Sequence, residues 1–197
     1  MAEYLQFDKL LNEDQMKKYE DLVTEENFEM FLKRKTVTTE GYGYRDDLDY
    51  SDKPYIDIPF YTHIFIKEGK KNSDRADVAM QLLQDFTDRS KISFEAVYRA
   101  QVNITNINLE KAPSAPHVDA TYPHHVLIYY ANQSDGGTVF YKGNDPFEIK
   151  KGVIENKIDH NYGRFVLFDG KHYHGQEHAP TTSNTRIVYN FNVKVKE

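Results

Sequence analysis

The sequence contains no cysteine and no tryptophan among its 197 residues. The lack of cysteine excludes disulfides, thiolate zinc sites, iron–sulfur clusters and a cysteine nucleophile. An excess of basic residues is also missing, because the formal net charge is −6 at pH 7. General binding to nucleic acids needs a basic surface that neutralises phosphates. We therefore expect no nucleic-acid partner.

Long hydrophobic runs are absent as well, and no stretch reaches the length that spans a bilayer. The first residues, MAEYLQFDKLLNEDQ, carry acidic side chains where a signal peptide would be basic. These features predict a cytoplasmic protein without a membrane partner. The sequence also has no phosphate-binding P-loop, dinucleotide-binding glycine motif, His-Glu-x-x-His motif or Gly-x-Ser-x-Gly motif.

The residues before position 92 predict helices and one extended segment. Asn12 and Gln15 have the spacing of a capping box, which predicts a helix over EDQMKKYEDLV. Thr24 is the expected cap of a second helix, EENFEMFLKR, and helical spacing predicts another helix over residues 76–86. Alternation predicts extended structure over residues 55–67. The Tyr-rich segment 41–55 has the composition of a loop, which would serve either as a substrate-binding lid or as an ordinary surface loop.

From residue 92 onward the pattern changes to short strands separated by turn residues. The predicted strands are ISFEAVYRAQVNI, HHVLIYYAN, GGTVFYK, FEIKKGVI, RFVLFDG and RIVYNFNVKV. Such a series is typical of a sandwich or barrel, so we expect a mainly β protein with supporting helices packed on its outside. The length suits a single domain over residues 1–197, in which 1–91 support a β core formed by 92–197.

Two of the predicted strands, at residues 98–104 and 186–195, alternate regularly between apolar and polar side chains. In the first, Arg99, Gln101 and Asn103 share the polar face. Two interpretations stay open. The polar faces either point to solvent, or they line a ligand cavity while the apolar faces pack against helices or a second layer.

A cluster of metal-binding residue types lies in this second half. His117 and Asp119 are separated by one residue, so in extended backbone both side chains project to the same side. The segment DGKHYHGQEHAP supplies three histidines for a third ligand, namely His172, His174 and His178. Two histidines and one carboxylate form the facial triad of non-haem Fe(II) oxygenases. A His-rich surface loop is the alternative explanation.

Arg186, at the start of the last predicted strand, strengthens the first explanation. In a 2-oxo acid that chelates the metal, the far carboxylate needs a cation held at a fixed distance. A guanidinium suits this task because it is planar, permanently charged and able to bind a carboxylate through two hydrogen bonds.

Residues 92–195 resemble the Fe(II)/2-oxoglutarate-dependent dioxygenases, particularly their prolyl-hydroxylase-like branch. The resemblance rests on HVD at 117–119, IYYAN at 128–132, the Gly pair at 136–137, RFVLFDG…HYHG at 164–175 and RIVYNFNV at 186–193. It implies a double-stranded β-helix, or jelly-roll, core with N-terminal α-helices outside it.

The resemblance also implies roles for individual residues. His117, Asp119 and His174 would bind iron, and Arg186 would bind the C5 carboxylate of 2-oxoglutarate. Tyr130 matches a tyrosine that hydrogen-bonds the cosubstrate. The segment before the triad, QVNITNINLEKAPSAP, departs from the family pattern, and Asn103 in it is a candidate for a cosubstrate contact.

The implied activity is hydroxylation of an unactivated C–H bond with Fe(II), 2-oxoglutarate and O2, releasing succinate and CO2. Ascorbate is a further candidate cofactor. Asp119 favours hydroxylation over halogenation, because related halogenases have a small residue there. The substrate would be a prolyl or other peptidyl residue of a peptide or protein, or else a free amino acid or other small molecule. Two alternatives stay open: a cupin-like metal enzyme that does not use 2-oxoglutarate, and a non-catalytic jelly-roll binding module.

Overall fold

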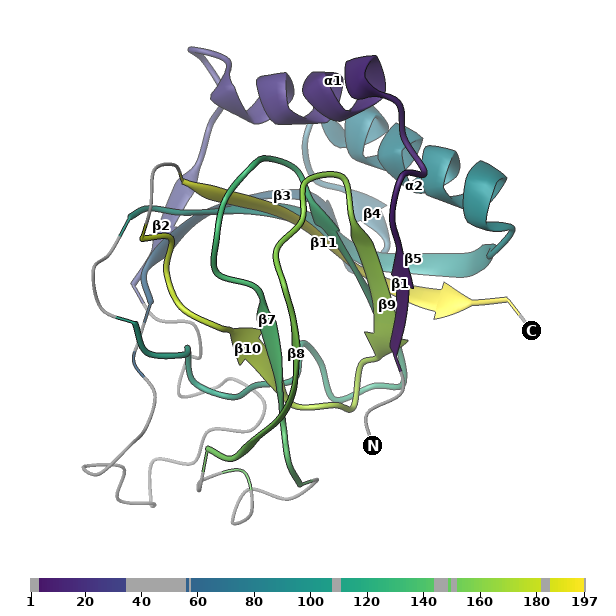
Figure 1. Cartoon of the computed structure of the whole chain (residues 1–197). Helices are drawn as coiled ribbons and strands as arrows, with labels where there is room; N and C mark the ends of the chain where they lie inside the picture. Colours follow the sequence, from purple (N-terminus) through teal and green to yellow (C-terminus); the bar gives the residue numbers. More distant parts are fainter. Residues whose placement is uncertain are drawn as a thin grey trace.

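A computed structural model describes residues 4–34, 56, 58–107, 111–143, 149, 152–181 and 185–196. Its main sheet has eight antiparallel strands, with β1, β9, β6, β11, β5, β3 and β2 in that order and β4 paired to β3. Their bounds are β1 Tyr4–Phe7, β2 Phe31–Lys33, β3 Phe60–Lys67, β4 Lys70–Lys71, β5 Phe94–Thr105, β6 His125–Tyr130, β9 Phe165–Asp169 and β11 Arg186–Val195. A second sheet faces it and consists of β7 Thr138–Tyr141, β8 Ile154–Ile158 and β10 His174–Gln176 (Figure 1).

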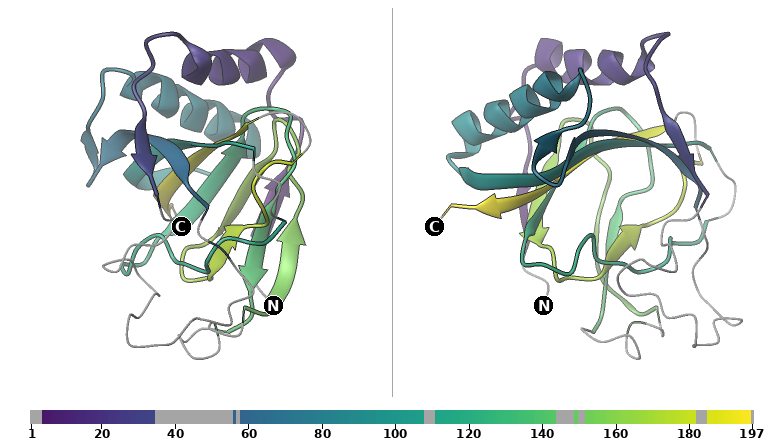
Figure 2. Two further views of the ribbon diagram at one scale, coloured as in Figure 1. Left: turned by 90° about the vertical axis from the view of Figure 1, so that its left-hand side faces the viewer. Right: turned by 180° about the vertical axis from the view of Figure 1, so that it is seen from behind.

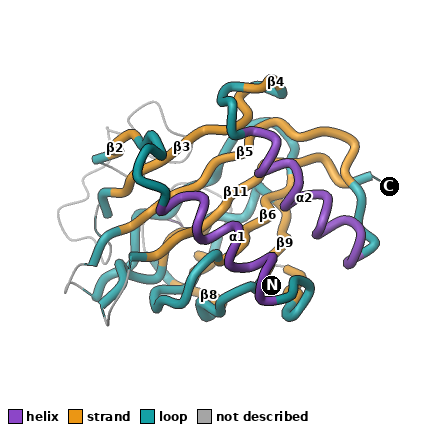
Figure 3. Tube along the Cα trace, turned by 90° about the horizontal axis from the view of Figure 1, so that it is seen from above, coloured by secondary structure: helices purple, strands orange, loops and turns teal. Residues whose placement is uncertain are grey.

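The two described helices, α1 (Glu13–Thr24) and α2 (Ala76–Ser90), lie over the outer face of the main sheet (Figures 1 and 2). Seen from above, both cross the central strands (Figure 3). The predicted capping box is present, since Asn12 Oδ1 accepts from the Gln15 amide at 2.9 Å and Gln15 Oε1 accepts from the Asn12 amide at 3.2 Å. The Tyr19 hydroxyl of α1 donates to Asp85 of α2 at 2.6 Å, which joins the two helices.

Because both faces of the main sheet are covered, the polar faces of β5 and β11 point to the interior. The apolar face of β5 and β11, including Val102, Tyr189 and Phe191, is buried with the helix residues Leu82 and Phe86 in one core. The polar face lines a cavity between the two sheets. The second of the two interpretations of the alternation is therefore correct: helices cover one face, and the other face surrounds a cavity.

A second apolar cluster holds the two sheets together beside this cavity. It joins residues of β6, β9 and β11 to residues of β7 and β8; its members are Val126, Ile128, Tyr130, Phe140, Ile158, Val166, Phe168 and Val188. The sheets are thus packed apolar against apolar at β6 and β9, and they separate around polar side chains at β5 and β3.

Several expected elements differ from the structure. The predicted helix over residues 25–34 is wrong, because α1 ends at Thr24 and Phe31–Lys33 pair with β3 as strand β2. Phe28 packs against His63, with ring centroids 4.6 Å apart. Tertiary pairing thus overrides the helical spacing of the aromatic residues. The strand expected at 147–154 begins at Ile154 and runs to Ile158. The Tyr-rich segment 41–55 lies outside the described residues.

Among the described residues, neither helix has the length and apolar composition needed to cross a membrane.

Candidate metal centre

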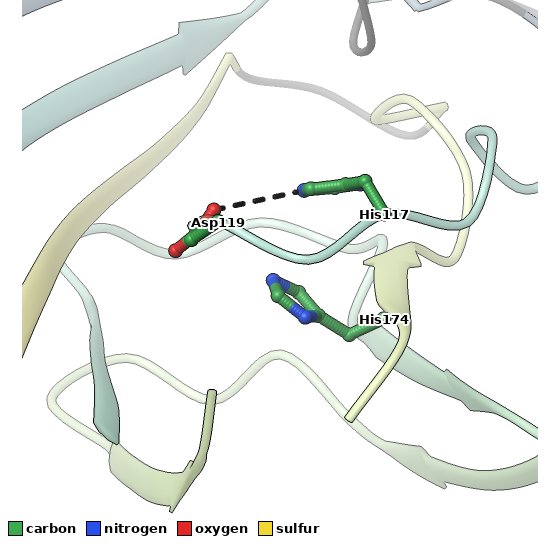
Figure 4. Close-up of side chains that lie close together, drawn as sticks. All are labelled: His117, Asp119 and His174. Atoms are coloured by element: carbon green, nitrogen blue, oxygen red, sulfur yellow. Dashed lines mark ion pairs between the residues drawn. The ribbon is translucent and has the colours of Figure 1, made fainter. Parts of the chain in front are cut away.

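Three side chains that can bind a metal converge at one end of the cavity. His117 and Asp119 come from the segment between β5 and β6, and His174 is the first residue of β10. One ligand atom from each lies within 4.8 Å of the others, and His117 Nε2 is 3.9 Å from Asp119 Oδ1 (Figure 4). The geometry arises because His117 and His174 form a β-bridge, each amide donating to the other's carbonyl at 3.0 Å. Within the described residues, this is the one such group.

Backbone carbonyls orient both imidazoles. His117 Nδ1 donates to Ala115 O at 3.1 Å, and His174 Nδ1 donates to His172 O at 3.0 Å. Because a carbonyl only accepts, the proton of each neutral ring is on Nδ1, which leaves the Nε2 lone pair for a metal. Burial also lowers the pKa of His174 to about 4, so this ring is neutral near pH 7.

The carboxylate is held by two neighbours from the main sheet. Arg99 Nη2 lies 3.0 Å from Asp119 Oδ1, and Asn190 Nδ2 donates to Asp119 Oδ2 at 3.1 Å. Burial by itself would raise the pKa of Asp119, but the Arg99 charge and the Asn190 hydrogen bond help to bring it below its ordinary value. The site therefore presents two imidazole Nε2 atoms and one ionised carboxylate, the donor set that suits a non-haem Fe(II) centre.

The same cavity contains Arg186 and has a volume of about 540 Å³. Arg186 is only 7% exposed, and its Nε donates to the Gly136 carbonyl at 2.6 Å. No carboxylate of the described residues lies within 4.0 Å of it. A buried guanidinium without a carboxylate partner is costly unless a ligand supplies the negative charge.

Tyr130 lies beside Arg186. The Arg186 guanidinium carbon is 5.6 Å from the centre of the Tyr130 ring, and the Tyr130 hydroxyl bonds to Thr138 Oγ1 at 2.7 Å. Burial, the largest effect, raises the pKa of Tyr130, so the hydroxyl keeps its proton near pH 7. Arg186 and Thr138 line the cavity, and Tyr130 contacts both of them.

The remaining predicted residues fall into two sets. Asn103 lines the cavity, and its buried Oδ1 has no hydrogen-bond partner in the described part of the chain. His172 and His178 do not join the triad. The His178 ring instead donates through Nδ1 to Ala179 O at 2.6 Å.

Sequence reasoning missed two residues that contact the candidate ligands, Arg99 and Asn190. Both belong to the polar faces of the alternating strands, so the alternation was the available signal. Their contacts with Asp119 depend on the pairing of β5 with β11, which brings Gln101 opposite Asn190 and Arg99 opposite Asn192.

No protein-family model and no curated protein matches the chain in sequence. Solved structures do match. A 2OG-Fe(II) oxygenase family oxidoreductase from Burkholderia pseudomallei aligns with a TM-score of 0.61 at 12% identity, covering 97% of this chain and 84% of its own. A prolyl-4-hydroxylase from Pseudomonas putida aligns with a TM-score of 0.54 at 12% identity, covering 100% and 95%.

A third match is the Trichoplax adhaerens prolyl hydroxylase in complex with a peptide fragment of the hypoxia inducible factor oxygen degradation domain. It aligns with a TM-score of 0.57 at 12% identity, covering 98% of this chain and 78% of its own. The chain therefore has the mainly β, antiparallel fold of the 2OG-Fe(II) oxygenases, and prolyl hydroxylases are among the proteins that share it.

Proposed function

We propose that the protein is an Fe(II)- and 2-oxoglutarate-dependent dioxygenase that hydroxylates an unactivated C–H bond. The observation that carries this proposal is the content of one cavity: a His-Asp-His group with ligand atoms within 4.8 Å, and a buried arginine without a carboxylate partner among the described residues. Fe(II) held by this group would supply the activation of O2 that couples oxidation of 2-oxoglutarate, to succinate and CO2, to oxidation of the substrate.

His117, Asp119 and His174 are the proposed metal ligands. The backbone hydrogen bonds of the two rings support this assignment, because they direct both Nε2 lone pairs away from the chain and toward the carboxylate. Arg99 and Asn190 hold the carboxylate in one orientation. Three protein ligands leave coordination positions for a chelating cosubstrate and for O2.

Arg186 is the proposed partner of the C5 carboxylate of 2-oxoglutarate. Arg186 and Asn190 are four residues apart on β11, about 13 Å along a strand, so the cavity separates the cation from the triad by a span that suits a dicarboxylate. Tyr130, which lies beside Arg186, is the proposed hydrogen-bond partner of the same cosubstrate. Asn103 lines the wall between the two ends and offers a further polar contact.

The proposed domain is the whole chain, residues 1–197. Strands β1, β2 and β3 support this, because they belong to the same sheet as β5, β6, β9 and β11. The proposed substrate is a prolyl or other peptidyl residue, or a small molecule. The peptide bound to the Trichoplax adhaerens structural neighbour supports the first of these.

The test is an anaerobic titration of the metal-free protein with Fe(II) and 2-oxoglutarate. A weak visible metal-to-ligand charge-transfer band is expected only when both are present. Asp119→Ala should abolish the band by removing a metal ligand, and Arg186→Ala should raise the 2-oxoglutarate concentration needed for it. His178→Ala is the matched control, since it removes a nearby histidine outside the triad and should leave the band unchanged.

Two other outcomes would contradict the proposal in different ways. Metal binding without a response to 2-oxoglutarate would indicate a cupin-like enzyme that does not use this cosubstrate. A protein that binds no metal would indicate a non-catalytic binding module. A separate assay compares succinate formation with and without added ascorbate, and it tests whether ascorbate supports turnover.

A further inference from the structure

The inner face of the main sheet carries a cationic side chain at each end. In the pairing of β5 with β11, Arg186 lies opposite Thr105 and Arg99 lies near the other end, opposite Asn192. Asp119 contacts Asn190 and Arg99, so the candidate metal centre lies toward the Arg99 end. The proposed cosubstrate site extends from the triad toward Arg186, which leaves Arg99 on the far side of the centre.

Arg99 also lies directly opposite a second cation. Strand β3 pairs with β5 so that Lys67 is the register partner of Arg99, and both residues line the cavity. Like charges directly opposite each other on paired strands are destabilising. Lys67 has no ion pair within 4.0 Å among the described carboxylates. The pair is stabilised if an anion lies between the two side chains.

Unsatisfied polar atoms follow the same wall of the cavity. Arg99 Nε is buried and has no hydrogen-bond partner in the described residues, and the same is true of Thr62 Oγ1 and Asn190 Oδ1. All three residues line the cavity. Leaving a buried polar atom unpaired is unfavourable, so this wall suits a polar ligand.

The charges of the assembled site point to the sign of that ligand. Asp119 supplies the one carboxylate among the described lining residues. With Fe(II) and 2-oxoglutarate bound as proposed, the two positive charges of the metal and that of Arg186 are balanced by Asp119 and the two cosubstrate carboxylates. Arg99 then shares Asp119 with the metal, and Lys67 and Lys33 have no ion pair with a carboxylate of the described lining.

We propose that Arg99 and Lys67 bind a carboxylate of the primary substrate, so that the enzyme acts on an anionic molecule or an acidic peptide. The inference deepens the proposed function and rests on it. The Arg99 Nε–H donates directly to the substrate carboxylate, while its Nη2 keeps its contact with Asp119. Lys67 adds attraction from the neighbouring strand, and Thr62 and Asn190 offer acceptors to polar hydrogens of the same ligand.

The experiment uses NMR of the arginine Nε–H groups in the full chain loaded with Zn(II), a diamagnetic substitute for Fe(II), and saturated with 2-oxoglutarate. Acetate is the anionic probe, and acetamide is its neutral isostere. Acetate should shift the Arg99 resonance saturably, with acetamide binding at least tenfold more weakly. Lys67→Gln should raise the acetate Kd about threefold, whereas Lys71→Gln, which removes the same charge outside the cavity lining, should not change it.

Three results would overturn the anion site: no saturable shift of Arg99, equal shifts with acetate and acetamide, or equal effects of Lys67→Gln and Lys71→Gln. The Arg186 resonance reports on the proposed function separately, because 2-oxoglutarate should shift it in the Zn(II) protein. If Arg186 does not respond while Arg99 binds acetate, the cosubstrate assignment fails and the anion site stands. If Arg186 responds to 2-oxoglutarate but Arg99 does not bind acetate, the oxygenase assignment stands and the proposal of an anionic substrate fails.

Discussion

Replacing Arg186 with methionine should affect stability and cosubstrate binding in opposite directions. Arg186 is 7% exposed, and burial lowers its pKa, which means that the charged form is disfavoured where it lies. Its Nε donates to the Gly136 carbonyl, and its guanidinium also interacts with the Tyr130 hydroxyl. Methionine keeps similar length and fills the same space without a charge.

The magnitude follows from two opposing effects. Removing a buried charge that lacks a carboxylate partner relieves a desolvation cost of several kcal/mol. Losing the hydrogen bond to Gly136 opposes this gain by about 1 kcal/mol. We therefore expect the free energy of unfolding of the ligand-free protein to stay the same or to rise by up to about 2 kcal/mol. The 2-oxoglutarate Kd should rise by about thirtyfold to a thousandfold, since removing one partner of a buried charge pair costs about 2–4 kcal/mol.

Urea denaturation measures the stability, and calorimetric titration of the Mn(II)-loaded protein measures the affinity. Arg164→Met is the matched control, because Arg164 has a carboxylate partner: its Nε and Nη2 lie 2.8 and 2.9 Å from the two Asp8 oxygens. That variant should lose about 1 kcal/mol of stability and keep its affinity for 2-oxoglutarate. A strongly destabilised Arg186→Met protein with unchanged affinity would refute the reasoning.

Three further predictions concern stability. Burial lowers the pKa of His160 to about 4, so as the pH falls below about 6.5 the unfolded chain binds a proton first, and this residue should reduce stability by up to about 1.4 kcal/mol per pH unit down to about pH 4. His160→Phe should remove that part of the pH dependence in urea denaturation; an unchanged profile would contradict it. Asn12→Ala should lower the unfolding free energy by about 1 kcal/mol by removing the capping box, and a thermal melt with no shift would argue against the cap. Gly137→Ala should lower the unfolding free energy by about 1–3 kcal/mol, because a Cβ at position 137 would collide with the Ile158 carbonyl of β8. A variant as stable as the wild type in urea denaturation would show that β7 and β8 can move apart to admit the Cβ.

Local sequence signals predicted the elements that have a recognisable cap or are long enough to show a period. The capping box marked the start of α1, and the spacing of Ala79, Leu82 and Phe86 marked α2. Strand β11 was predicted with its bounds, because every residue except Val188 follows the alternation of polar and apolar side chains. The helix expected at 25–34 failed, since Phe31–Lys33 form a strand only because β3 lies beside them.

Short strands were the hardest to predict. Strand β1 has four residues and was not anticipated, since it is defined by its pairing with β9, more than 150 positions away in the sequence. Strand β10 has three residues and pairs with β7. A segment this short contains too few residues for a period to be recognised, and its hydrogen bonds come entirely from distant partners.

For the candidate site, the sequence by itself determined which chemical groups are available. It placed His117 and Asp119 on one side of an extended segment, ordered a histidine cluster and Arg186 behind them, and separated the polar and apolar faces of two strands. These properties depend on residue type and backbone period, which neighbours in the chain establish.

The tertiary structure alone decided which of these groups meet. It grouped His174 with the His117–Asp119 pair rather than His172 or His178, because a β-bridge joins positions 117 and 174. It turned the polar faces inward, because α1 and α2 cover the apolar ones. It also brought Arg99 against Asp119 and opposite Lys67. Contacts of this kind depend on strand register and on which face of a sheet is buried, and both are determined by the packing of the whole chain.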